Sequence, residues 1–319
     1  MASAGRTLLA AKRVVERAEE RFVPRRLSSH FTSASADSER RLAAVLCEHD
    51  IDPAVHEPLA ASRLQRDRIA VIPWLDRTRP LRSSRILEVG CGRGASTVAL
   101  AEQGAELIAL DRSESALEIA EIRVAGHDLR TEFLTGDAAE LDTVLGGRTV
   151  DWIIFWASLE HMTVPERLEA LAAAWSTLPA GGILTLVETP NRLWFLDSHT
   201  SHLPYFNWLP DELALRYARF SPRDAIRRLP AEPTQRGLRD LLRSGRGVSF
   251  HEFDLAIGPA GNLDVVSCLQ LERRRRNPLR NMGWRVSRAG RYESILRRVS
   301  PAVPRAFLQP FLYLSIRKP

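Results

Sequence analysis

Gly90, Gly92 and Gly94 form a glycine-rich turn whose residue types and spacing suit ligand binding. They follow the apolar run 85–89 in a G-x-G-x-G pattern. Because glycine has no Cβ, the backbone can turn sharply here and approach a ligand closely. Glu88 precedes the turn and could accept hydrogen bonds from a cationic amine, directly or through water. The turn alone does not identify the ligand, since nicotinamide-dependent enzymes carry a similar one.

Two further acidic residues follow the next two apolar runs. Asp111 ends the run 105–110, where its carboxylate could hold a ribose diol. Asp137 and Ala138 follow the run 131–135 and could contact the edge of an adenine. In an open parallel sheet, ligands bind beyond the carboxyl ends of the strands. The three turns together therefore predict a nucleoside-binding site.

From residue 85 the sequence alternates between apolar strands and helices. Strands are expected at 85–89, 105–110, 131–135, 150–155 and 182–187, followed by a helix at 234–243, a strand at 248–257 and a last strand at 311–317. This alternation predicts an α/β fold with a mainly parallel sheet covered by helices on both faces. Right-handed crossovers make the sheet doubly wound. We expect seven strands.

Three regions are expected around this pattern. Residues 1–80 predict an N-terminal helical region, with helices at 7–22, 38–49 and 59–76. Residues 81–257 form the binding core, in which the aromatic- and histidine-rich segment 191–219 is expected to be a lid loop. Residues 258–319 comprise an Arg-rich insertion, 259–305, and the final strand.

The positive charge is concentrated near the C-terminus. Residues 216–319 hold 22 Lys and Arg against 8 Asp and Glu, in a chain whose net charge is +6. A basic face of this kind could meet an anionic substrate or an anionic membrane surface. A general compositional preference for arginine explains the excess equally well. Nucleic acid is disfavoured because aromatic residues are not interleaved with the arginines.

The remaining composition favours a cytoplasmic globular protein. The three cysteines, Cys47, Cys91 and Cys268, are too few and too scattered for a disulfide framework or a cysteine-based zinc site. No apolar run reaches the roughly 18 residues of a spanning helix. Lys12 and Arg13 interrupt the apolar start that a secretory signal needs.

Taken in order, the motifs resemble those of class I S-adenosylmethionine-dependent methyltransferases. The sequence RILEVGCGRG is similar to the first motif of that family, and ALDRS, TGDAAEL, VDWIIFWASLEHM and LPAGGILTLVETPNR are similar to those that follow. The resemblance covers residues 80–195 well and 234–257 loosely. It implies S-adenosylmethionine as the cofactor. The cofactor-binding residues that it implies are Glu88, Gly90, Cys91, Gly92, Gly94, Asp111, Arg112, Asp137, Ala138 and Trp156.

The reaction that the resemblance implies needs alignment more than bond activation, because a sulfonium methyl is already a strong electrophile. A hydroxyl acceptor would also benefit from a general base. His161, which follows the fourth strand, is the first candidate for that base. His199 and His202 in the lid loop are further candidates for catalytic residues in the acceptor pocket.

A divalent metal is not expected, although one motif fragment points toward it. Glu160-His161 resembles part of the Glu-x-x-Glu-His metal motif of ubiquinone-biosynthesis O-methyltransferases, but Ala157 stands at the first glutamate position. Glu160, His161 and Asn191 are therefore only weak metal candidates.

The sequence thus predicts a methyltransferase, most readily an O-methyltransferase that acts on a small molecule or a saccharide, which could be anionic. One alternative is a nicotinamide-dependent oxidoreductase, although its G-x-G-x-x-G turn would place the third glycine one residue later. A second alternative is a non-catalytic cofactor-binding scaffold that docks a partner or a membrane. The acceptor and the oligomeric state are not predicted.

Overall fold

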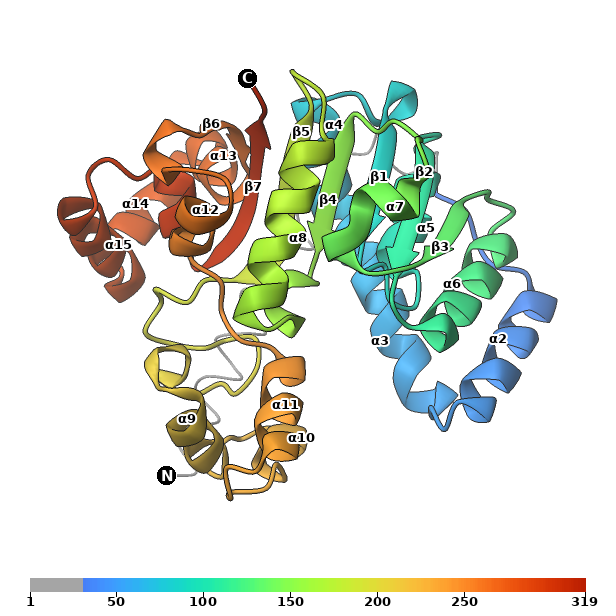
Figure 1. The fold of residues 1–319 in the computed structure, drawn as a ribbon, viewed down its shortest axis with the longest axis horizontal. Coiled ribbons are helices and arrows are strands. Elements are labelled where there is room, and N and C mark those ends of the chain that lie inside the picture. Colours follow the sequence, from blue (N-terminus) through green and yellow to red (C-terminus); the bar gives the residue numbers. More distant parts are fainter. Residues whose placement is uncertain (1–30) are drawn as a thin grey trace.

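The computed structural model describes residues 31–319, and its centre is a seven-stranded sheet (Figure 1). The order of the strands is β3-β2-β1-β4-β5-β7-β6, and only β7 runs antiparallel to its neighbours. The strands are β1 Arg85–Val89, β2 Glu106–Asp111, β3 Glu132–Thr135, β4 Trp152–Trp156, β5 Ile183–Pro190, β6 Asp264–Cys268 and β7 Phe311–Arg317. The predicted doubly wound, mainly parallel seven-stranded fold is confirmed.

Helices cover both faces of the sheet, as the alternation predicts. On one face, α4 Ile72–Thr78 and α5 Ala95–Ala101 pack on side chains such as Trp152 and Ile154. On the other face, α8 Val164–Thr177 packs on Phe155. The other helices of this part are α2 Ala36–Glu48, α3 Pro53–Arg66, α6 Glu114–Gly126 and α7 Leu141–Leu145. Buried on both faces, β4 is continuously apolar rather than alternating.

The N-terminal helices differ from the prediction in their boundaries. The expected helix 59–76 is divided into α3, a π-helical turn at Asp67–Val71, and α4. The expected helix 38–49 corresponds to α2. The expected helix 7–22 lies outside the described residues.

The expected strand 248–257 is wrong, because this segment forms α12 Phe250–Ala256. Ser249 and Glu252 form a capping box that begins the helix, with Glu252 Oε2 accepting hydrogen bonds from the backbone N and the hydroxyl of Ser249. Phe250 and Phe253, three residues apart, both face the core. The sixth strand is β6, within the segment 259–305 that was expected to be an insertion.

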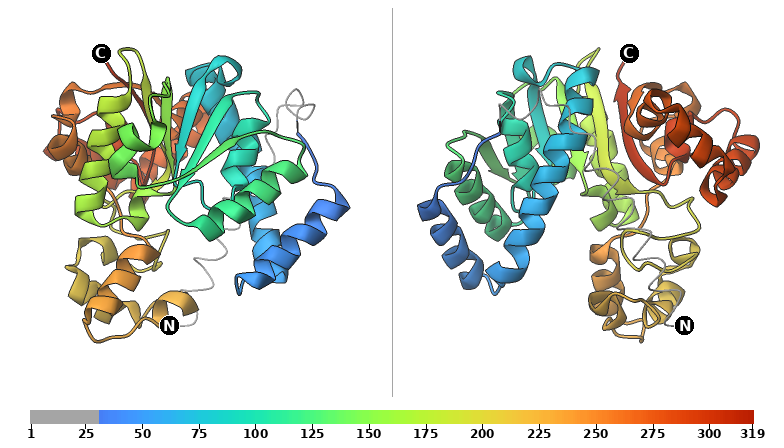
Figure 2. Two further views of the ribbon diagram at one scale, coloured as in Figure 1. Left: turned by 45° about the vertical axis from the view of Figure 1, so that its right-hand side comes forward. Right: turned by 180° about the vertical axis from the view of Figure 1, so that it is seen from behind.

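The segment 191–219 is more structured than a lid loop. It contains a 3-10 turn at Phe206–Trp208 and the helix α9 Asp211–Ala218. With α10 Asp224–Arg227 and α11 Gln235–Ser244, α9 forms a small helical body with its own apolar cluster. This body lies beside the carboxyl ends of the central strands (Figures 1 and 2).

Three further helices, α13 Leu269–Arg276, α14 Pro278–Val286 and α15 Arg288–Val299, lie between β6 and β7 in the sequence. They project from the end of the sheet opposite to α2 (Figures 1 and 2). None of the described helices combines the length and the apolarity that crossing a membrane requires.

We expect Phe253→Ala to destabilise the protein by about 3–5 kcal/mol, because Phe253 is fully buried and contacts Phe307 edge to face. Leu255→Ala on the same helix is the control, since Leu255 is 74% exposed and its truncation should cost under about 0.5 kcal/mol. Urea unfolding measures both. Equal losses would contradict a helix here, because residues 253 and 255 share a face only in a strand.

Candidate functional site

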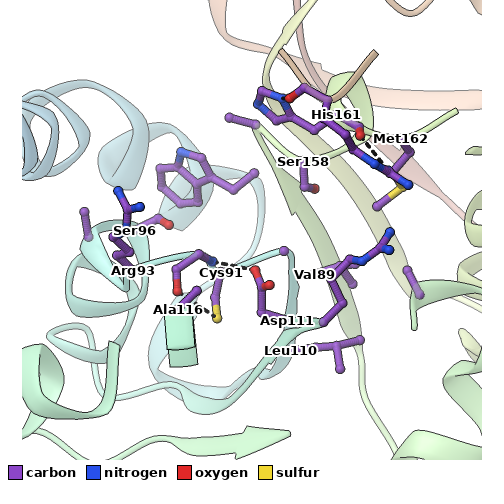
Figure 3. A pocket seen from close by; sticks show the side chains of 18 of the residues that line it. Val89, Cys91, Arg93, Ser96, Leu110, Asp111, Ala116, Ser158, His161 and Met162 are labelled. Carbon is purple, nitrogen blue, oxygen red and sulfur yellow. Dashed lines mark hydrogen bonds between the residues drawn. The ribbon is translucent and has the colours of Figure 1, made fainter. Parts of the chain in front are cut away.

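A pocket of about 660 Å³ opens at the carboxyl ends of β1, β2 and β4 (Figure 3). Strand order reverses here, since the chain proceeds from β1 to β2 on one side and returns to β4 on the other. Such a switch point is where open α/β sheets bind ligands. Of the predicted site residues, those that line the pocket are Gly90, Cys91, Gly92, Asp111, Arg112, Asp137, Ala138, Trp156 and His161.

The glycine turn adopts a backbone conformation that requires glycine. Gly90, Gly92 and Gly94 have φ values of +77°, +53° and +83°. A Cβ on Gly90 would lie 2.4 Å from Ser158 Cβ, and one on Gly94 would lie 2.9 Å from Ala120. A Cβ on Gly92 would meet nothing within 4 Å. Gly90 and Gly94 are therefore fixed by packing, whereas Gly92 borders the open pocket.

Asp111 holds the turn in place from the neighbouring strand. Its Oδ2 accepts a hydrogen bond of 2.8 Å from Gly92 N (Figure 3), and its Oδ1 accepts one of 2.9 Å from Ser113 N. Ionised carboxylate oxygens each have capacity for a second hydrogen bond. The carboxylate can therefore order the turn and still accept from a diol in the pocket.

Glu88 lies beneath the turn and is completely buried. Its Oε2 accepts a hydrogen bond of 2.7 Å from Thr97 Oγ1, while its Oε1 has no partner among the described residues. Burial raises the pKa of Glu88, with Ser96 and Thr97 opposing the shift. An unpartnered buried carboxylate oxygen is costly, and a cationic amine in the adjoining pocket would satisfy it.

The third strand contributes the far end of the pocket. Asp137 caps a 3-10 turn, with its Oδ1 accepting from Ala139 N at 3.0 Å, and Ala138 is nearly buried beside it. Arg112 is more exposed and pairs with Glu166 at 3.3 Å. Because the cap uses Oδ1, the other carboxylate oxygen of Asp137, which lines the pocket, can accept a hydrogen bond from a ligand.

The end of β4 is strained and carries unpartnered polar atoms. Ala157 has a φ of +49°, which is unfavourable for a residue with a Cβ. On either side of it, Trp156 Nε1 and Ser158 Oγ are buried without partners among the described residues. All three residues line the pocket. Unpartnered donors beside a cavity fit a polar ligand.

His161 lies on the pocket wall opposite Arg93 and Ser96 (Figure 3). Its Nδ1 is 2.8 Å from the carbonyl oxygen of Arg243. A carbonyl only accepts, so Nδ1 carries the proton and Nε2 is the unprotonated nitrogen. Burial lowers the pKa of His161, so the ring is neutral at pH 7. It can therefore accept a proton.

Buried arginine contacts fix the turn that carries His161. Arg167 is 1% exposed and donates to the carbonyl oxygens of Leu159, Glu160 and Met162. Arg243 donates to the His161 carbonyl oxygen at 2.8 Å and pairs with Glu166 at 2.6 Å. The ring and the backbone of His161 are thus both held from α11.

His199 lies behind His161 and outside the pocket lining. Their ring centroids are 5.9 Å apart, and His199 Nε2 is 3.6 Å from Glu160 Oε1. Burial lowers the pKa of His199 to about 4. Burial also raises the pKa of Glu160 to about 8, so this carboxyl is largely protonated at pH 7. Both groups are therefore neutral.

The other two lid residues lie apart from this cluster. His202 does not line the pocket and has a φ of +56°. Asn191 is 2% exposed, and its Nδ2 donates to the carbonyl oxygens of Phe307 and Gln309 at 2.7 Å each. Its Oδ1 accepts from Leu193 N at 3.0 Å. Asn191 is thus committed to the backbone and is not available as a metal ligand.

Glu160, His161 and His199 could together hold a cation, since one candidate ligand atom from each lies within 4.8 Å of the others. His199 Nδ1 is 3.1 Å from Thr200 Oγ1, which in turn donates to the Gly245 carbonyl. This fixes the His199 proton on Nδ1 and leaves Nε2 as the potential ligand. A metal would require deprotonation of Glu160, whose burial opposes it.

The pocket residues that were not predicted from the sequence include three basic residues from other helices. His56 and Arg63 come from α3, and Arg243 comes from α11. Arg63 pairs with Glu188 at 3.4 Å, while its Nε has no hydrogen-bond partner among the described residues. The spacing of Leu59 and Arg63, one helical turn apart, places them on one face, but nothing in the sequence indicates that this face meets the pocket.

Comparison with known proteins connects this geometry to a family. Residues 86–182 match the family model described as a methyltransferase domain. The chain is 32% identical over 96 residues to the cypemycin N-terminal methyltransferase of a Streptomyces species, covering 28% of this chain and 38% of that protein. It is 29% identical over 111 residues to the ubiquinone biosynthesis O-methyltransferase of Aromatoleum aromaticum, covering 35% and 46%. The chain thus spans less than half of these relatives.

Among solved structures, the S-adenosylmethionine-bound amino pentose methyltransferase CalS10 from Micromonospora echinaspora is 29% identical, covering 36% of this chain and 47% of that chain, with a TM-score of 0.31. The strand order and the glycine turn place a candidate ligand site at the switch point of an α/β sheet. In its sequence, the core at residues 86–182 is thus similar to a methyltransferase domain.

We expect Gly92→Val to weaken binding of S-adenosylhomocysteine at least 100-fold, because the branched side chain would enter the pocket. Gly147→Val is the matched control, since Gly147 has a φ of +83° and a Cβ there also meets nothing within 4 Å. Both variants should lose similar stability to left-handed strain, but only Gly92→Val should lose binding in calorimetry. Equal affinity in the two variants would place the ligand elsewhere.

Proposed function

We propose that this protein is a methyltransferase that uses S-adenosylmethionine to methylate a hydroxyl oxygen of a small molecule or a saccharide. One observation carries the proposal: a single pocket joins the glycine turn and Asp111 to the neutral ring of His161. The first group suits an adenosyl ligand, and the second suits deprotonation of an acceptor.

The residues present fit the cofactor. Asp111 would hold the ribose, Asp137 and Ala138 would flank the adenine, and Glu88 would balance the ammonium group. Glu88 Oε1 and Trp156 Nε1 are buried and have no hydrogen-bond partner among the described residues. A bound cofactor would supply polar partners for both atoms. When bound, the cofactor supplies an electrophilic methyl group on a sulfonium. Orientation of the acceptor in line with that methyl supplies most of the rate.

His161 would take the acceptor proton. With its Nδ1 proton held by the Arg243 carbonyl, Nε2 has the free lone pair. The neighbouring Glu160 and His199 are neutral at pH 7. Because Glu160 carries no negative charge, it does not stabilise a protonated His161 ring in the resting enzyme. The role is that of a general base, for which typical contributions are 10²–10⁴-fold in rate.

Arg63 favours an acceptor with an anionic group. It lines the pocket from α3, where it pairs with Glu188 at 3.4 Å and lies 4.0 Å from Asp67, and its Nε lacks a hydrogen-bond partner among the described residues. A guanidinium can bind a carboxylate or a phosphate in a fixed geometry. Two relatives, a ubiquinone biosynthesis O-methyltransferase and an amino pentose methyltransferase, are methyltransferases of small-molecule biosynthesis by name.

The nicotinamide alternative is separated from the proposal by ligand binding. We expect S-adenosylhomocysteine to bind and to raise the thermal transition, and NAD to do neither. Asp111→Asn should weaken binding of S-adenosylhomocysteine at least tenfold, because the amide has one acceptor atom and would present its NH₂ group to either Gly92 N or Ser113 N. Binding of NAD without S-adenosylhomocysteine would overturn the proposal.

We expect His161→Ala to lower methyl transfer at least 100-fold while the affinity for S-adenosylhomocysteine changes less than threefold. Transfer of a radiolabelled methyl group to a panel of hydroxyl compounds measures the rate. His251→Ala is the control, because His251 stacks on Phe250 outside the pocket. If affinity and rate fell together, His161 would be structural. Cofactor binding without transfer to any acceptor would favour a non-catalytic scaffold.

A further inference from the structure

The helix α14 presents its apolar side chains to solvent. Leu279, Met282 and Val286 follow a helical i, i+3, i+7 spacing and therefore share one face. They are 76%, 62% and 71% exposed, and α14 has no buried residue. In a surface helix of a globular domain, such a stripe faces the core. In α14 the orientation is reversed.

The next helix, α15, shows the same reversal. Ile295 and Val299, one turn apart, are 54% and 70% exposed. In contrast, the charged residue Glu293 on the same helix is 2% exposed. The two helices thus form a hairpin that exposes these aliphatic side chains, whereas Glu293 and the aromatic residues Trp284 and Tyr292 face inward, the last two against Trp194. We call α14 and α15 the C-terminal hairpin.

Polar contacts attach the C-terminal hairpin to the domain. Glu293 pairs with Arg305 and Arg274, and it accepts a 3.0 Å hydrogen bond from Gln309 Nε2 and a 2.5 Å bond from Trp284 Nε1. These contacts fix which side of the hairpin faces inward. The outward position of the apolar stripe follows from them, so it is a feature of the folded structure.

Arginine surrounds the apolar stripe. Residues 269–299 contain ten arginines and two glutamates. Both glutamates are paired within the domain, Glu293 as described and Glu272 with Arg276 at 3.5 Å and Arg77 at 3.7 Å. The two helices that carry the exposed aliphatic residues also carry exposed arginines, which include Arg285, Arg288, Arg291, Arg297 and Arg298. The face is therefore both apolar and strongly cationic.

We propose that the C-terminal hairpin docks on an anionic lipid bilayer. Amphipathic helices with arginine at the border of an apolar face lie in the plane of a bilayer, with the apolar side chains between the acyl chains. The arginines would meet lipid phosphates, which attract basic segments strongly. Nucleic acid would use the arginines but not Leu279, Met282 and Val286. A second copy of this face would bring two cationic surfaces together.

The hairpin is also connected to the segment that follows β5. Tyr292 donates a 2.7 Å hydrogen bond to the Leu193 carbonyl and packs edge to face on Trp194 and Phe195. His199 lies a few residues further along. A bilayer-bound hairpin would thus hold one end of the segment beside the candidate site. The docking proposal itself does not depend on the reaction in that pocket.

Vesicle co-sedimentation of the full-length protein tests the proposal. We expect at least tenfold tighter binding to vesicles of phosphatidylcholine with 30% phosphatidylglycerol than to phosphatidylcholine alone. Leu279→Glu/Val286→Glu should weaken binding to the mixed vesicles at least tenfold. Val55→Glu/Leu213→Glu is the matched control, because it adds the same charge at side chains that are 61% and 49% exposed on α3 and α9. It should change binding less than twofold.

A second pair of variants tests the charge. Arg285→Gln/Arg288→Gln/Arg291→Gln should weaken binding at least tenfold, whereas Arg41→Gln/Arg130→Gln/Arg236→Gln removes equal charge from exposed positions elsewhere and should change it less than twofold. Circular dichroism should show every variant folded.

Two results would overturn the proposal. One is equal loss in the hairpin variants and their controls, which would show attraction by net charge alone. The other is absence of vesicle binding by the wild-type protein. In that event, light scattering could still find a dimer that Leu279→Glu/Val286→Glu converts to a monomer. That case would make the stripe an interface between copies of the chain.

Discussion

The hydrogen bond from Gly92 N to Asp111 Oδ2 is the contact on which the site depends. It connects the turn after β1 to the end of β2, and the Gly90 and Cys91 amides support it by donating to the Leu110 carbonyl at 2.8 and 3.1 Å. The turn can make these bonds only with its glycines in left-handed conformations. The parallel pairing of β1 with β2 brings the two strand ends to one edge. The Asp111 carboxylate thus fixes the conformation of the turn and faces the pocket in which a ligand would bind.

The opposite wall is governed by burial of ionisable groups. Glu160 is fully buried without a hydrogen-bond partner for its carboxyl oxygens among the described residues, and His199 beside it is largely buried. Because a low-dielectric environment disfavours the charged forms, both groups are neutral at pH 7. His161 shares this environment but opens onto the pocket. Burial keeps the His161 ring neutral, and the hydrogen bond to the Arg243 carbonyl fixes its tautomer.

The sequence predicted what depends on local pattern and failed where the pattern is ambiguous or contacts are distant. The strands 85–89 and 311–317 were predicted at the residues that form β1 and β7, because apolar runs bounded by turns are informative. The apolar pattern of residues 248–257 is compatible with a strand or a helix. The capping box at Ser249 and Glu252 favours the helix α12. The strand β6 was not predicted. It pairs with β7, begins with the exposed Asp264 and lies within the segment that was expected to be an Arg-rich insertion. The pocket residues of α3 and α11 depend on tertiary packing that one sequence does not reveal.

Arginine content alone could not distinguish composition from function, but the positions of the arginines separate the two. Some are buried and serve the fold: Arg167 donates to a set of carbonyls around the His161 turn, and Arg246 donates to the Phe206 and Leu209 carbonyls at 2.7 and 2.6 Å. Five planar donors allow one side chain to satisfy several backbone acceptors, which lysine cannot do in the same geometry. A compositional preference explains why arginine fills such roles. It does not explain why apolar side chains occupy the exposed face between the arginines of α14 and α15, since stability gains nothing from that arrangement. A surface that is unfavourable in water is expected where its working environment is not water.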